Sequence, residues 1–94
     1  MAESDNDLLG LVANGDRAAF DRLVLRHRGP LSAFANRLLG SRSDAEEIVQ
    51  ECLTRVWSHA PRWDPEGNAR AWIYRIAHNL SVDRLRARRP TVDI

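Results

Sequence analysis

Apolar residues recur at intervals of three and four along most of the chain, and strand-like alternation of apolar and polar residues is absent. This spacing places apolar side chains on one face of a helix, so the sequence predicts an all-α fold. Gly15, Gly40 and Pro61 interrupt the pattern and divide it into four segments. We expect a compact bundle of three main helices plus a short N-terminal helix.

The first two helices each have a candidate N-cap and a glycine at the C-terminal end. A short helix over 7–13 is predicted to begin at Asp7, with Gly15 just beyond its end. The second is predicted to begin at Asp16 and to end at Gly40.

Pro30 lies inside the second helix and cannot donate a hydrogen bond to the carbonyl of Arg26. Two short helices are the usual consequence of an internal proline. The apolar stripe, however, keeps its phase across this proline, which favours one long helix that is kinked or loosened near Gly29. The stripe comprises Phe20, Leu23, Val24, His27, Leu31, Phe34, Ala35 and Leu38.

The third helix is predicted to begin at Ser43, which has the spacing of a capping box with Glu46, and to stop near Pro61. One face of it carries all the apolar positions, so we expect that face to be buried. These positions are Ala45, Ile48, Val49, Cys52, Leu53, Val56 and Trp57.

Asp64 to Gly67 match a type I turn, inside a loop over 61–67. The fourth helix is expected over about 68–88, with Pro90 ending it. Its core stripe is predicted to comprise Ala69, Trp72, Ile73, Ile76, Ala77 and Leu80.

The composition is that of a soluble globular chain: 94 residues, 44% apolar and 29% charged. No apolar run approaches the roughly 20 residues of a membrane span, and the acidic N-terminus differs from a secretory signal. A single cysteine, Cys52, excludes an internal disulfide. We therefore expect a cytoplasmic protein without membrane insertion.

Charge is unevenly placed along the chain, and all 14 basic residues are arginine. Residues 1–67 hold 8 arginines and 11 acidic residues, a net charge of −3, whereas 68–94 hold 6 and 2, a net charge of +4. An acidic body with a basic C-terminal helix suggests two different partners.

Two surfaces are candidates for function. Acidic side chains of the third helix lie opposite its core stripe, either as a docking face for a basic partner or as a solvated face that suits the helix dipole. The fourth helix and its loop combine arginines with Trp63, Trp72 and Tyr74, a pattern that suits phosphates and stacked bases. Trp72 falls on the core stripe, whereas Trp63, beside a turn, is harder to assign to the core.

The histidines lack the spacing of metal ligands, and His27 fits a partly buried structural position. Cys52 lies on the core face and is expected to be a small buried apolar residue. We predict no catalytic residues, no metal and no cofactor.

Two blocks resemble region 2 of bacterial sigma factors, closest to the extracytoplasmic-function (ECF) group. The first runs Asp44-Ala45-Glu46-Glu47-Ile48-Val49-Gln50-Glu51, and the second is Ala71-Trp72-Ile73-Tyr74-Arg75-Ile76-Ala77-His78-Asn79-Leu80. The resemblance covers about 7–89, leaving 1–6 as a tail and 90–94 as the start of a linker.

The resemblance implies that the third helix docks on the clamp helices of the RNA polymerase β′ subunit. It also implies that the loop and fourth helix recognise and help melt the promoter −10 element by binding the non-template strand, with one base flipped into the loop. The implied polymerase-binding residues are Asp44, Glu46, Glu47, Gln50, Glu51 and Thr54. The implied DNA-binding residues are Arg62, Trp63, Asp64 and Asn68 in the loop, and Arg70, Tyr74, Arg75, His78, Asn79, Val82, Arg84 and Arg86 on the helix, with Arg88 as a further phosphate contact.

Family members usually continue into a second helical domain that reads the −35 element, whereas this sequence stops at Ile94. We therefore expect an excised domain, and the family further suggests an anti-sigma factor as a partner. A protein-only helical adaptor and a small metal-dependent hydrolase are the alternative interpretations.

Overall fold

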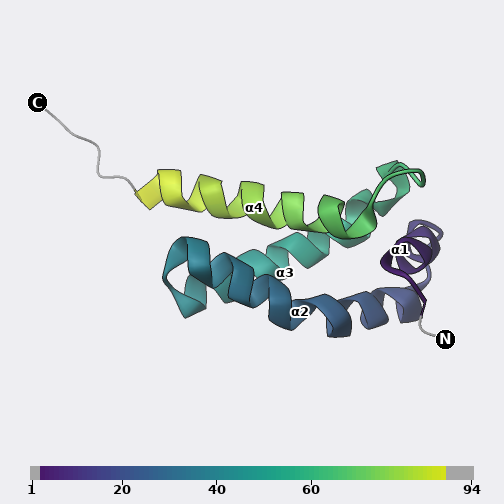
Figure 1. Ribbon diagram of the computed structural model, residues 1–94, viewed down its shortest axis with the longest axis horizontal. Coiled ribbons are helices and arrows are strands. Elements are labelled where there is room, and N and C mark those ends of the chain that lie inside the picture. Colours follow the sequence, from purple (N-terminus) through teal and green to yellow (C-terminus); the bar gives the residue numbers. More distant parts are fainter. Residues whose placement is uncertain (1–2, 89–94) are drawn as a thin grey trace, which may run out of the picture.

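The computed structural model describes residues 3–88 and confirms the all-α bundle. Three long helices lie along the length of the molecule, and a short helix crosses one end, beside the start of the second helix and the loop that precedes the last (Figure 1). The elements are α1 (Asp5–Ala13), α2 (Arg17–Leu39), α3 (Arg42–His59), a 3-10 turn η1 (Ala60–Arg62) and α4 (Ala69–Arg88).

Helix α1 begins at Asp5, two residues before the predicted start at Asp7. Ser4 is the N-cap, because its hydroxyl accepts a hydrogen bond from the backbone N–H of Asp7 at 3.0 Å. The Asp7 carboxylate in turn accepts from the backbone N–H of Ser4 at 3.3 Å, which completes a capping box. Asp7 therefore belongs to the cap as its third helical residue.

Helix α2 is one continuous helix, as the phase of its apolar stripe predicts. The Asp16 side chain accepts from the N–H of Ala19 at 3.0 Å and caps its start. Gly40, with φ of 63°, ends it in the left-handed conformation that favours glycine. Pro30 is exposed, so its ring faces solvent and leaves the core stripe intact.

Helix α3 is capped by Ser41, and the prediction that Ser43 is the cap is wrong. The hydroxyl of Ser41 accepts from the N–H of Asp44 at 3.2 Å. Gly40 turns the chain out of α2, which leaves Ser41 extended and allows the helix to begin at the next residue. Ser43 consequently lies inside the first turn.

The core forms where the apolar stripes of the four helices meet, and it includes His27 and Cys52 as expected. Trp57 departs from the prediction, because 37% of it is exposed. Its ring packs edge-on against Phe20, with ring centroids 5.2 Å apart, and the Arg17 guanidinium lies 5.7 Å from the centroid of the Trp57 ring. The fully buried large side chains include Leu8, Leu9, Leu23, Leu31, Ile48, Val56 and Ile73.

The predicted turn is confirmed, since the N–H of Gly67 donates to the carbonyl of Asp64 at 2.8 Å. Asn68 then caps α4 by accepting from the N–H of Ala71 at 2.9 Å. The predicted helix stop at Pro90 and the predicted linker over 90–94 lie outside the described residues.

Candidate functional site

The loop residues singled out from the sequence share one pocket. Arg62, Trp63, Asp64 and Asn68 line a cavity of about 450 Å³. Trp72 and Arg75 of α4 close its other side, together with Gly67 and Ala71. The turn and the first two turns of α4 therefore form a single concave surface.

Trp63 is buried, with only 7% of it exposed, and it belongs to the hydrophobic core. From the sequence, Trp63 was harder to assign to the core because it adjoins a turn. Its indole lies beside Gly67, where an added Cβ would be 3.5 Å from Nε1. Trp63 thus forms a rigid wall of the pocket instead of an exposed stacking platform.

Two polar side chains of the pocket are partly committed to local structure. One carboxylate oxygen of Asp64 accepts from the N–H of Glu66 at 2.9 Å, and the amide oxygen of Asn68 caps α4. The second carboxylate oxygen of Asp64 and the amide nitrogen of Asn68 are the groups left to bind a ligand. One accepts and the other donates hydrogen bonds.

On α4, Arg75, His78 and Asn79 are exposed at positions three and four apart, which places them on one face. Tyr74 differs from the prediction of a surface position, because it is half-buried against Phe34 with ring centroids 5.3 Å apart. The Arg70 guanidinium lies 5.1 Å from the centre of the Tyr74 ring. Val82 is also half-buried.

Two of the arginines predicted to contact phosphate are instead bound to acidic side chains in this structure. Arg84 lies 3.2 Å from Asp44 and 2.9 Å from Glu47. Arg88 contacts Asp44 and also donates to the carbonyl of Leu39 at 2.7 Å. Arg86 is exposed on the same part of α4.

These contacts change the acidity of Asp44. The hydrogen bond from Arg88 lowers the pKa of the Asp44 carboxyl, partial desolvation opposes that change, and the positive charges of Arg88 and Arg84 lower it further. Asp44 is accordingly an ionised anchor between α3 and the end of α4.

The exposed face of α3 carries the remaining predicted docking residues: Glu46, Glu47, Gln50, Glu51 and Thr54. Asp44 is less available, because only 25% of its side chain is exposed. Glu51 pairs with Arg55 one turn later at 3.0 Å, and the Thr54 hydroxyl donates to the carbonyl of Gln50. The face is acidic and polar, as its residue pattern predicts.

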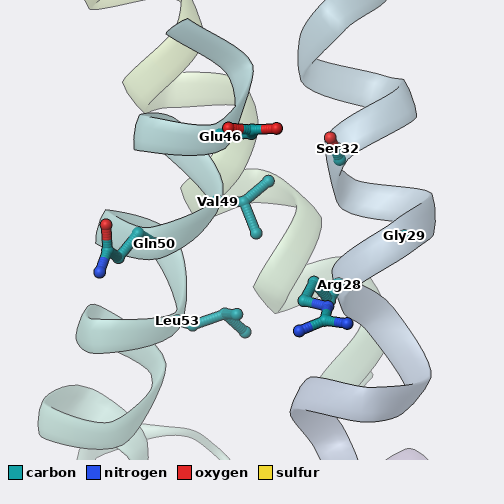
Figure 2. Close-up of a pocket in the computed structure, with 7 residues that line it drawn as sticks. All are labelled: Arg28, Gly29, Ser32, Glu46, Val49, Gln50 and Leu53. Carbon is teal, nitrogen blue, oxygen red and sulfur yellow. The ribbon is translucent and has the colours of Figure 1, made fainter. Parts of the chain in front are cut away.

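A groove of about 530 Å³ runs beside this face, between α2 and α3. Figure 2 shows Val49 and Leu53 of α3 extending toward Arg28 and Gly29 of α2. Ser32 completes the α2 wall. These α2 residues were not predicted, because helical periodicity shows which face of α2 is polar but not that α3 lies alongside it.

Within residues 3–88, no group of three or more His, Cys, Asp and Glu side chains is arranged to hold a metal ion. No helix in that range is both long and apolar enough to cross a membrane.

The Sigma-70 region 2 family matches residues 23–91, so the chain belongs to that family. Its curated relatives include the ECF RNA polymerase sigma factor SigW of Bacillus subtilis, which is 34% identical over 79 residues. That match covers 84% of this chain and 42% of SigW. SigE of Mycolicibacterium smegmatis is 38% identical over 79 residues, covering 81% of this chain and 30% of SigE. The resemblance to the ECF group is confirmed, and the chain spans less than half the length of these relatives.

A solved structure has the same fold. It is the NMR structure of an engineered region 2 of sigmaE in complex with GTAAAA, which is 30% identical, superposes with a TM-score of 0.81 and matches over 93% of each chain. The shared fold extends over α1 as well as the three long helices.

Proposed function

We propose that this chain is the part of an ECF sigma factor that docks on RNA polymerase and recognises the promoter −10 element. One observation carries the proposal: Arg62, Trp63, Asp64 and Asn68 share a pocket next to the exposed basic face of α4. The engineered sigmaE region 2, with the same fold, binds a short oligonucleotide. The protein acts in transcription initiation and is proposed to be cytoplasmic.

The pocket suits one unstacked base of the non-template strand. A base held there would contact the Trp63 wall and exchange hydrogen bonds with Asn68 and Asp64. Capturing an unstacked base favours the open strand over the duplex, which would help melting. Arg75 and Asn79 lie further along α4 for the neighbouring nucleotides.

Docking would use the α3 face and the groove beside it. The carboxylates Glu47 and Glu51 would exchange their present partners, Arg84 and Arg55, for charge-assisted hydrogen bonds to arginines of the β′ clamp helices. The apolar Val49 and Leu53 in the groove would accept an apolar side chain of the same partner. An anti-sigma factor would inhibit the protein by covering this surface.

Binding to a purified β′ clamp-helix fragment tests the docking proposal. Glu47→Arg should abolish binding and Gln50→Ala should weaken it, whereas Asp21→Arg, at an exposed carboxylate of α2, should leave it unchanged. A folded chain whose wild type does not bind the fragment would contradict docking and favour the adaptor alternative.

Selection from a single-stranded DNA pool with six randomised nucleotides tests the recognition proposal. The wild type should enrich a preferred sequence, and Asn79→Ala should change it. Arg86→Ala should lower the salt slope of binding by about 1. Arg84→Ala should lower it less, because Arg84 is paired with Asp44 and Glu47. Enrichment of no sequence by the wild type would count against base recognition.

A further inference from the structure

The first turn of α1 reaches the pocket loop, which is more than sixty residues away in the sequence. The Asn6 side-chain nitrogen donates to the carbonyl of Gly67 at 2.9 Å. The Asn6 side-chain oxygen accepts from the backbone N–H of Ala69 at 2.8 Å. A single carboxamide therefore binds the backbone on both sides of Asn68.

The N–H of Ala69 lacks a partner within its own helix. The N–H of Ala69 is in the first turn of α4, where no preceding helical carbonyl is available. The loop is tightly folded here, since an added Cβ at Gly67 would lie 3.0 Å from the carbonyl oxygen of Asp64. Asn6 thus fixes the backbone where the pocket passes from the turn into the helix.

The first turn of α1 is itself held on α2. Asp5 contacts the His27 ring at 2.8 Å and the Arg26 guanidinium at 2.9 Å. Glu3 pairs with Arg22 at 3.1 Å. Asn6 therefore connects the pocket loop to an anchored element and not to a free chain end.

We propose that Asn6 is a positioning residue for base binding, which it serves by holding Asn68 and the Trp63 wall in register. This inference rests on the proposed recognition of DNA. Asn6 itself lies outside the residues that line the pocket. Its role is to set the orientation of the Asn68 amide, one of the groups proposed to form hydrogen bonds with the base.

The main test compares Asn6→Ala with Asn14→Ala in the full 94-residue chain. Asn14, the C-cap of α1, is the matched control, because its amide donates locally to the carbonyl of Gly10 at 3.3 Å. Asn6→Ala should speed hydrogen exchange of the Ala69 amide and weaken binding to the enriched oligonucleotide, by at most the roughly 5- to 150-fold that two hydrogen bonds contribute. It should also reduce the preference at one nucleotide position, while clamp-fragment binding stays at the wild-type level.

Asn6→Asp is a second variant that separates the two hydrogen bonds. It keeps an oxygen that accepts from Ala69 but loses the donor to the Gly67 carbonyl. Exchange of the Ala69 amide should stay slow. The second carboxylate oxygen would face the Gly67 carbonyl without a proton to donate, and the added negative charge opposes DNA binding, so the readout for this variant is the base preference and not the affinity. If Asn6→Ala fails to fold, this variant decides the question by its base preference.

Two outcomes would overturn the proposal. Faster Ala69 exchange in Asn6→Ala with unchanged affinity and base preference would show a contact that stabilises the fold without positioning the pocket. If the wild type enriches no sequence, the proposed DNA recognition is wrong, and so is the positioning role of Asn6 that rests on it. Ala69 exchange would then still report whether the Asn6 contact exists in solution.

Discussion

At the scale of single residues, the chemistry of Cys52 is set by burial. Its side chain is fully buried and its thiol lies 3.6 Å from the carbonyl of Ile73. Burial raises the pKa of the thiol to about 12, against a small opposing effect of Arg55. At pH 8 roughly one thiol in ten thousand is then ionised, and the thiolate is the reactive form.

We therefore predict that Cys52 in the folded chain reacts with a thiol reagent at least 100-fold more slowly than in urea. The rate can be followed by absorbance with a chromogenic disulfide. Rapid labelling of the native chain, at the rate of a free thiol, would mean that α3 separates from α4 under native conditions.

Apolar periodicity predicted the environments of Cys52 and His27, because each falls in the middle of a helical stripe. It failed for the tryptophans at the ends of elements. Trp57 lies on the predicted face of α3, yet 37% of it is exposed. Trp63 is buried although it lies in a loop, where helical periodicity does not apply. Their burial depends on how far the neighbouring helices extend.

At the scale of elements, the unusual feature is a proline in the middle of α2. Pro30 provides no N–H for the helix, and the side chain is exposed, so nothing in the core requires its ring. Pro30→Ala should restore one backbone hydrogen bond and raise the free energy of unfolding by about 1–3 kcal/mol. Urea denaturation measures this change from the midpoint and the slope of the transition. A loss of stability would show that the bundle packs around the proline's geometry.

Gly29→Ala is the companion variant in the same turn. A Cβ at Gly29 meets nothing within 4 Å, so the change should stabilise the helix by about 1 kcal/mol through its higher helix propensity. Because Gly29 lines the groove, both the thermal midpoint of the Gly29→Ala variant and its binding to the clamp fragment should be measured. An unstable Gly29→Ala would indicate that the backbone there is less regular than a helix.

Helix boundaries were predicted correctly where only one residue could serve as the cap, and wrongly where two residues could. Asp16 and Gly40 had no rivals, and both are confirmed. Ser41 and Ser43 each precede an acidic residue by three positions, so local spacing could not separate them. The choice follows from Gly40, whose left-handed backbone leaves Ser41 extended.

At the scale of the whole molecule, contacts between distant segments were the part that the sequence could not supply. Four pocket residues were predicted together because they are close in sequence. The contacts of Asn6 with Gly67 and of Arg84 with Asp44 join elements that periodicity treats separately. Both depend on how the helices pack, which a pattern along one helix does not contain.

The long-range contacts of two carboxylates, Asp5 and Asp44, make the fold sensitive to acid. Burial alone would raise the pKa of Asp5, but its hydrogen bonds from His27 and Arg26 outweigh burial and hold that pKa below its usual 3.8. Asp44 is lowered likewise, chiefly by Arg88. A carboxyl whose pKa is lower in the folded state contributes its full stabilisation above the unfolded value and loses it as the pH falls through the folded value.

The urea midpoint should therefore hold from pH 7 to about pH 5 and decline below about pH 4, as the unfolded chain takes up protons first. Asp5→Asn with Asp44→Asn should start from a lower midpoint at pH 7 and decline less between pH 5 and pH 3. Asp21→Asn with Asp83→Asn removes the same two negative charges at exposed carboxylates and serves as the control for net charge. Parallel acid profiles for the wild type and the double variant would mean that other carboxylates hold the bundle together, and that α1 and the end of α4 are anchored mainly by apolar packing.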